Sequence, residues 1–484
     1  MHTVAIVPPP DDSPGAPAGV LTGSEDGVVL RAAARGDGLG DFFDPAEVGA
    51  HVGGAAVRAI ALVPDVPGGG LKLPPASEPA EPSAASRQTS PPPPSYTLLT
   101  AGAKEVLHAW RVSWERAGSA SASAAAGTPP ASAWRLRTSL LATRGSLVKP
   151  GHAEWTKGCG FVAASVASDQ RYMDVAGFAP LAGGPAVALA ASSEGAVAAM
   201  ALERGDSRRG AAGEASARAD RNTPASARGG RAPPSGYRWR TIADLRFHDR
   251  PVLAVDVAGV FAADGAVAVV AATGATDGSM AIWEMSSAVG EKDSPGSGSV
   301  RALVPSHVTR SAHQSGVNDV AVRGVAGAAG GFVAASGGDD QVARAEVFRV
   351  TAEAPPGGSR GDGASGRRFR VVSVARVATP FAHSSAIKGV WLGRGARAGT
   401  LTLATTSHDQ RVRVWTVASR VAEDAVTMTP SAGAFVECPE PESLDGFVDN
   451  RGCARVVVCG RGVQMFDLEV ARGVSGSLAR RVSS

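Results

Sequence analysis

The sequence predicts an all-β fold of repeated sheets, a β-propeller, because three stretches far apart in the chain end in the same way. Each places a tight polar turn before a short alternating apolar segment that closes on a tryptophan. Alternation with a period of two after a polar turn is typical of strands in hairpins, and recurrence at a long interval is typical of a repeat array. The three stretches are TAGAKEVLHAW (100–110), TGATDGSMAIW (273–283) and TTSHDQRVRVW (405–415), ending on Trp110, Trp283 and Trp415.

A histidine stands 26 to 29 residues before an aspartate in three of the repeats. An Asp side chain in a tight turn can accept hydrogen bonds from its own turn amides. In WD repeats this Asp also accepts a hydrogen bond from the preceding His, and such a buried network stiffens the sheet. We therefore interpret these residues as structural members of WD repeats, not as metal ligands or general bases. The pairs are His248 with Asp277, His313 with Asp340, and His383 with Asp409.

Seven units of a turn followed by a strand can be placed along the chain, which predicts a WD40-type propeller of about seven blades. Histidine-led segments at 248–257, 313–322 and 383–392, with a fourth at 51–63, read as the innermost strands. The first unit supplies only a second and a third strand. Its inner strand either comes from residues 3–8 or is missing, and the chain would read as a truncated product or as the C-terminal portion of a longer protein. The turns lie at 22–27, 100–105, 191–195, 273–278, 336–341, 406–410 and 459–462.

Most of these turns are roughly 60 to 90 residues apart, well above the 40 to 45 residues of a WD repeat. Segments rich in Pro, Ala, Ser, Gly and Arg account for the excess, and they hold too few apolar residues to offset the entropy of ordering them. We expect one propeller over residues 1–469, a tail at 470–484, and disordered loops on the rim. The predicted insertions are 64–95, 116–133, 203–236, 286–311 and 352–368.

Composition narrows the class of protein without naming a partner. The chain has 484 residues, 44% of them apolar, and a net charge of +3. Only 6 of the 48 basic residues are Lys, a bias that a GC-rich genome can produce, so bulk Arg content is weak support for nucleic-acid binding. The four cysteines have no C-x-x-C spacing, the N-terminus lacks a secretory signal, and no apolar run reaches about 20 residues. We expect a cytoplasmic protein without a membrane span.

Two basic regions are candidates for contact with RNA, because Arg guanidinium groups and aromatic rings together bind phosphates and stack on bases. One lies in the insertion at 203–236 and includes Arg228 and Arg231. The other, Arg367, Arg368 and Arg370, stands at the entry to a predicted strand. A solvated surface in an Arg-biased chain is the alternative for both regions.

Motifs of catalysis are missing from the sequence. There is no G-x-x-x-x-G-K-[ST] loop and no H-E-x-x-H pair, and the one G-x-S-x-G string, GGSRG at 357–361, lies inside a predicted insertion. We therefore predict that the chain is not an enzyme and has neither cofactor nor metal. A catalytic site at the mouth of the central channel remains as an alternative.

Four strings go beyond the generic repeat, and their order resembles one family. SDQRYMDVAGF (168–178) opens a blade without a histidine, and AHQSGVNDVAV with ASGGDDQVARAEVF spans 312–348. SSAIKGVWL with ATTSHDQRVRVWTV follows at 384–417, and an acidic, proline-containing lead-in begins the last string at 436–469. Together they resemble the C-terminal portion of the WD-repeat regulatory subunit of the tRNA anticodon-wobble ribose 2′-O-methyltransferase.

That resemblance covers most of the sequence from about residue 50 to 469, outside the insertions, and members of the family are longer. It implies a non-catalytic cytoplasmic protein that binds the methyltransferase catalytic subunit and helps position tRNA. S-adenosylmethionine would then belong to the partner. The alternative is a general interaction scaffold, such as an adaptor in ubiquitin ligation or trafficking, because function lies in sites grafted on a fold.

Overall fold

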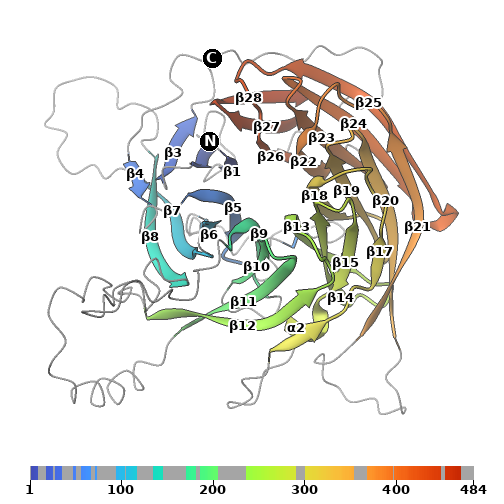
Figure 1. The fold of residues 1–484 in the computed structure, drawn as a ribbon, viewed down its shortest axis with the longest axis horizontal. Coiled ribbons are helices and arrows are strands. Elements are labelled where there is room, and N and C mark those ends of the chain that lie inside the picture. Colours follow the sequence, from blue (N-terminus) through green and yellow to red (C-terminus); the bar gives the residue numbers. More distant parts are fainter. Residues whose placement is uncertain are drawn as a thin grey trace, which may run out of the picture.

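The computed structural model describes sixteen segments of the chain, and their strands form seven sheets arranged around an axis (Figure 1). Six sheets contain at least four strands, and the seventh contains three among the described residues. The prediction of an all-β, WD40-type propeller is confirmed. The described residues are 2–8, 18–24, 28–34, 47–50, 56–66, 71–72, 94–103, 105–116, 134–144, 170–180, 186–204, 236–289, 300–353, 368–395, 397–448 and 453–469.

The first three sheets are formed by residues 3–246, joined by one short strand from further along the chain. The first contains β1 (Thr3–Val7), β2 (Ala18–Gly23), β3 (Val28–Ala34) and β4 (Glu47–Ala50). The second contains β5 (Val57–Pro64), β6 (Ser95–Gly102), β7 (Leu107–Arg116) and β8 (Trp134–Arg144). The third contains β9 (Tyr172–Phe178), β10 (Val187–Ser192), β11 (Ala196–Arg204), β12 (Tyr237–Arg246) and the parallel β16 (Arg301–Leu303).

The other four sheets follow in chain order. The fourth contains β13 (Val252–Phe261), β14 (Val267–Ala275), β15 (Met280–Glu284) and β17 (His307–Thr309). The fifth contains β18 (Val317–Gly324), β19 (Gly331–Gly338), β20 (Ala343–Ala352) and β21 (Phe369–Thr379). The sixth contains β22 (Ile387–Arg394), β23 (Thr400–Ser407), β24 (Arg411–Arg420) and β25 (Ala425–Phe435). The seventh contains β26 (Ser443–Val448), β27 (Cys453–Gly460) and β28 (Gly462–Glu469).

The first sheet is complete, because β1 supplies the inner strand that the sequence left open. Its register pairs Thr3 with Gly23 and Val7 with Gly19. The first and seventh sheets also pack together: Val4 and Ile6 share a buried cluster with Val457. The ring therefore closes between the two ends of the described chain, which lie side by side in Figure 1.

Two of the predicted insertions contain ordered structure. The segment at 286–311 holds the short helix α2 (Ser286–Val289) and both β16 and β17. In the insertion at 64–95, Leu71 is fully buried, and its carbonyl accepts a hydrogen bond from the Gly259 amide. Composition predicted disordered loops in both segments. Backbone hydrogen bonds to a neighbouring strand order parts of them, and such bonds need no apolar side chain. Residues 117–133, 205–235 and 354–367 lie outside the described residues, so disorder there stays a prediction.

The hydrophobic core lies between neighbouring sheets, and a carboxylate on an inner strand also links several of them. One Asp oxygen accepts the amide of the residue that follows, and the other accepts an amide of the next sheet's inner strand. Burial raises the pKa of these carboxyls, that of Asp174 to about 7. The links join Asp174 to Val255 (2.8 Å), Asp319 to Val390 (2.6 Å) and Asp445 to Ile6 (2.9 Å).

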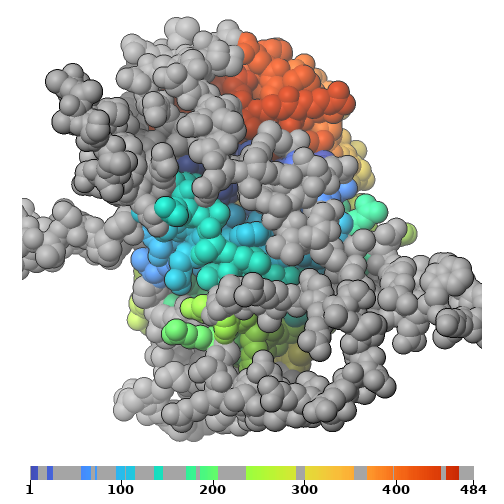
Figure 2. Space-filling view, turned by 90° about the vertical axis from the view of Figure 1, so that its left-hand side faces the viewer, coloured from blue at the N-terminus to red at the C-terminus, as the bar shows by residue number. Residues whose placement is uncertain are grey.

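The outer edges of the sheets form the sides of the molecule. Figure 2 shows one side, with residues of the second sheet in cyan and C-terminal residues in orange-red above them. Among the described residues, no helix is long and apolar enough to cross a bilayer.

Candidate functional site

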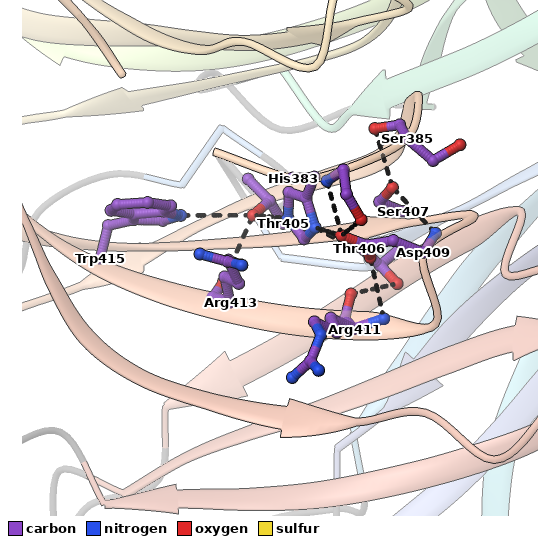
Figure 3. Close-up of polar contacts among 10 residues, drawn as sticks. His383, Ser385, Thr405, Thr406, Ser407, Asp409, Arg411, Arg413 and Trp415 are labelled. Carbon is purple, nitrogen blue, oxygen red and sulfur yellow. Dashed lines mark hydrogen bonds and ion pairs between the residues drawn. The ribbon is translucent and has the colours of Figure 1, made fainter. Parts of the chain in front are cut away.

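The sixth sheet contains a hydrogen-bonded network of His383, Thr405, Asp409 and Trp415, which includes the predicted contact of His383 with Asp409 (Figure 3). Trp415 Nε1 donates to Thr405 Oγ1 at 3.3 Å, and His383 Nε2 lies 2.9 Å from the same hydroxyl. His383 Nδ1 lies 3.0 Å from Asp409 Oδ2. Asp409 also accepts the amides of Ser384 and Arg411, so one carboxylate fixes both its own turn and the strand entry.

Burial sets the protonation of this network. It lowers the pKa of His383, and the nearby Asp409 offsets only part of that effect. For Asp409 burial acts to raise the pKa, but the Ser384 amide and His383 outweigh it, and the net pKa is lowered. A neutral histidine and an ionised aspartate result, both away from solvent. This geometry fits a structural role for the two residues better than a catalytic one.

The fourth sheet has the same network with one extra member. Trp283 Nε1 donates to Thr273 Oγ1 at 3.0 Å, and His248 Nε2 lies 2.8 Å from that hydroxyl. His248 Nδ1 lies 2.9 Å from Ser279 Oγ, which donates to Asp277 at 2.5 Å. Asp277 thus reaches His248 through Ser279, whereas the sequence predicted direct contact. The longer spacing in this repeat leaves room for the relay.

The second sheet keeps only part of the network among the described residues. Trp110 Nε1 donates to Thr100 Oγ1 at 3.1 Å. The histidine predicted to begin this sheet, His51, lies outside the described residues.

The fifth sheet has the histidine, the hydroxyl and the aspartate but lacks the tryptophan. His313 Nδ1 lies 2.8 Å from Asp340 Oδ1, and His313 Nε2 lies 2.8 Å from Ser336 Oγ. In the sheets with a tryptophan, that residue stands ten positions after the hydroxyl residue. Ten positions after Ser336 stands Glu346, whose register opposite Ala334 matches that of Trp415 opposite Leu403.

Glu346 is a buried carboxylate, 6% exposed, that three donors hold in place. Ser373 Oγ donates to Oε1 at 2.5 Å, Thr309 Oγ1 donates to Oε2 at 3.0 Å, and His307 Nε2 lies 3.4 Å from Oε1. Burial acts to raise the pKa of Glu346, but these contacts outweigh it and lower the pKa below its ordinary value. Sequence reasoning missed this residue, although the fixed offset of ten could have revealed it.

The carboxylate forms the floor of a cavity of about 360 Å³ between the outer strands of the fourth and fifth sheets. Arg310 and Arg376 also line this cavity. A second cavity, of about 500 Å³, shares His307 and Ser373 with the first and contains Arg370. We call the two together the β17–β21 groove. Of the predicted RNA-contacting residues, the structure therefore brings Arg370 into the groove.

The other predicted RNA-contacting residues are placed less fully. Arg368 is exposed at the entry to β21, and its carbonyl accepts the Glu353 amide. Arg228, Arg231 and Arg367 lie outside the described residues. Within the described chain, no group of three or more His, Cys, Asp or Glu is arranged to hold a metal ion.

The sheets and the His–Asp networks define a WD40-type β-propeller. No protein-family model matches the chain, and no curated protein matches it in sequence. It is similar in structure to Chaetomium thermophilum Sqt1 (13% identity, TM-score 0.44), covering all of this chain and 86% of that one. Sqt1 of the same organism bound to the N-terminus of ribosomal protein L10 gives 13% identity and a TM-score of 0.40, covering 96% and 85%.

A third similar structure is a humanized mutant of the C. thermophilum Polycomb Repressive Complex 2 bound to the inhibitor GSK126. The identity is 12% and the TM-score 0.40, with 86% of this chain and 66% of that chain covered. Identities this low inform on the fold alone, and these TM-scores are too low to carry an argument. The assignment to a WD40-type propeller therefore rests on the strands and His–Asp networks described above.

Proposed function

We propose that this chain is a non-catalytic WD-repeat subunit that binds the catalytic subunit of a tRNA ribose 2′-O-methyltransferase. It would help position tRNA for methylation of the anticodon wobble nucleotide. The observation that carries the proposal is the placement of the four strings that resemble this family. They form the inner strand of the third sheet and then most of the fifth, sixth and seventh sheets, in that order.

The chemistry of the repeats supports a positioning role. Their histidines are buried and hydrogen-bonded to hydroxyl and aspartate partners, while Arg370 and Arg376 are exposed on the outer strand of the fifth sheet. A separate active site needs its substrate held in place, and contacts far from the reacting atoms can supply that orientation. Guanidinium contacts to phosphates position a nucleic acid without reading its sequence.

The test is co-purification and activity. The chain is expressed with a wobble 2′-O-methyltransferase catalytic subunit, and gel filtration is followed by measurement of tRNA 2′-O-methylation with S-adenosylmethionine. We expect co-elution and a faster reaction than with the catalytic subunit alone. Separate elution with an unchanged rate would end the proposal. A catalytically inactive methyltransferase that still co-elutes serves as the control for background activity.

A general protein-interaction scaffold is the second candidate, and two exposed aromatic residues favour it. Phe381 is 81% exposed and has φ of 54°, a left-handed conformation that costs free energy for a bulky residue. Phe435 is 56% exposed. The two residues lie just before His383 and Val436, whose amides bond the turn carbonyls of the fifth and sixth sheets, so both stand at one end of adjacent blades.

Capture experiments separate the two candidates. Purified chain immobilised on resin is exposed to extract, and bound proteins are identified by mass spectrometry. Recovery of ubiquitin-ligase or vesicle-coat subunits without a methyltransferase would favour the scaffold. A Phe381→Ala, Phe435→Ala double variant should lose most of its partners, since buried aromatic anchors contribute about 2 kcal/mol or more each. Val66→Ala, at a side chain that is 57% exposed, is the matched control.

A further inference from the structure

The β17–β21 groove exists because the outer strand of the fourth sheet is short. β17 has 3 residues, whereas β21 beside it has 11 (Figure 1). A strand of three residues cannot cover the face of the longer one, and two adjoining cavities follow β21 from Phe369 to Arg376. The groove is therefore elongated along one strand.

The floor of the groove is polar. Glu346 stands where other repeats carry tryptophan, so the volume of an indole ring is missing from the fifth sheet. Its carboxylate is engaged by Ser373, Thr309 and His307 and exposes only 7% of the side chain. The negative charge is thus buried and satisfied, and the groups that a ligand would meet are those on the walls.

The walls carry exposed positive charge. Arg310 lies with its guanidinium carbon 5.5 Å from the centroid of the Phe247 ring, which leaves its N–H edge free to donate. Arg370 and Arg376 are both exposed, and no side-chain hydrogen bond or ion pair joins them to another described residue. Glu353 is the exposed acid in the lining. The lining thus holds three exposed arginines and one exposed carboxylate, so the groove favours anions.

The spacing of these arginines indicates an extended ligand. Arg370 pairs with Thr351 and Arg376 with Glu346, so the two arginines are five register positions apart, about 17 Å, with a bulge in β21 between them that places their side chains on opposite faces of the strand. A single phosphate cannot reach both. We propose that the β17–β21 groove binds the phosphodiester backbone of RNA through Arg310, Arg370 and Arg376, with Glu346 holding the floor open. This inference rests on the proposed function and names the surface that would contact tRNA.

A nucleic-acid backbone fits the groove better than an acidic peptide. The backbone carries one charge per nucleotide and needs only cations and hydroxyl donors, which Ser306 and Ser311 supply alongside the arginines. A peptide would also need partners for its own amides. Phe369 in the lining is only 7% exposed, so it offers no ring face for base stacking, and binding should be tolerant of sequence.

The first experiment removes the charges. Binding of a fluorescent tRNA transcript to the full chain is measured by fluorescence anisotropy at salt concentrations from about 50 to about 300 mM. This roughly sixfold range of salt gives the slope of log affinity against log salt. The Arg370→Gln, Arg376→Gln variant should bind roughly tenfold more weakly, and its slope of log affinity against log salt should fall by about two. Arg250→Gln, Arg397→Gln removes two exposed charges elsewhere and should change little. Equal losses in the two variants would overturn the groove as the site.

The second experiment fills the groove without removing any positive charge. Glu346→Trp restores the residue type of the other repeats and deletes a negative charge. General electrostatics predicts tighter RNA binding by this variant, whereas occupation of the groove by indole predicts weaker binding. We expect at least a fivefold loss of RNA affinity in a variant that still unfolds cooperatively. Binding that is unchanged or tighter in a folded variant would contradict the proposal.

Two further arms assign the ligand and separate this inference from the proposed function. A fluorescent poly-glutamate peptide is titrated in the same way, and binding of that peptide but not of RNA through Arg370 and Arg376 would overturn the RNA assignment. Association with the methyltransferase is measured on the groove variants by gel filtration. RNA binding through the groove with no methyltransferase association would end the proposed function and leave the groove assignment standing.

Discussion

The fifth and sixth sheets are neighbours with the same repeat chemistry, yet they differ at one position. Both bury a histidine between an aspartate and a hydroxyl, at His313 and His383. The sixth then completes the network with Trp415, whereas the fifth has Glu346 at the equivalent register. The comparison shows that the His–Asp contact does not require the tryptophan.

The strand that covers each position explains the difference. Trp415 packs in a buried cluster with Ala375 and Val377 of the long strand β21. Glu346 instead faces β17, which is too short to exclude water from it. An indole ring gains from full burial, whereas a carboxylate needs donors and nearby solvent. The partner strand therefore decides which residue type the position accepts.

Removal of the tryptophan should have the largest effect. Trp415→Ala deletes a buried ring and should lower the free energy of unfolding by about 3–5 kcal/mol. The measurement is urea denaturation of the purified chain. Trp415→Phe keeps most of the apolar volume and loses the hydrogen bond to Thr405, so it should cost less. A loss below about 1 kcal/mol for the alanine variant would show that the two positions do not differ as argued.

Truncation of the glutamate should cost less. Glu346→Ala frees Ser373, Thr309 and His307, which lie at the groove and can bond water, so we expect a loss of about 1–2 kcal/mol. The same urea titration measures it. Glu423→Ala, at a side chain that is 63% exposed, is the control and should change stability by less than about 0.5 kcal/mol. A loss as large as that of Trp415→Ala would contradict the comparison.

Acidification should weaken both sheets, because they share the His–Asp contact. Burial lowers the pKa of His313 and His383 below 6.5, so the unfolded chain takes up more protons as the pH falls through that value. The pKa of Asp340 and Asp409 is lowered below 3.8 and extends the loss to lower pH. The stability that these His–Asp contacts contribute above pH 6.5 is therefore lost on acidification.

The melting temperature measured between pH 7.5 and 5 checks this dependence. Over this range the inner-strand carboxyls of Asp174, Asp319 and Asp445, whose pKa is raised, act in the opposite direction, so the test is the difference between the wild-type chain and the variants. His383→Gln should melt lower at pH 7.5 and lose less on acidification, and His313→Gln should behave alike. Identical slopes in the wild-type chain and both variants would mean that other groups set the pH dependence.

Much of the fold was predictable because the repeats carry local signals. Turn residues such as Asp409 and the alternation that ends on Trp283 indicated the third strand of each sheet, and the inner strands followed from the histidines. The segment at 286–311 was mispredicted, because β16 and β17 are held by backbone pairing to β12 and β15 and their composition is that of a loop. Likewise Arg370 was singled out by charge alone, without the groove that surrounds it.

The sequence by itself determined the recurring turns with the strands that follow them, and the contacts of His313 with Asp340 and His383 with Asp409, since hairpins and His–Asp spacings depend on residues close along the chain. Tertiary structure alone decided that residues 3–7 close the ring against the seventh sheet, and that Glu346 and Arg376 share a cavity with Arg310. These contacts join sheets, and the lengths of neighbouring outer strands set them. A local sequence pattern does not specify the length of the outer strand in the neighbouring sheet.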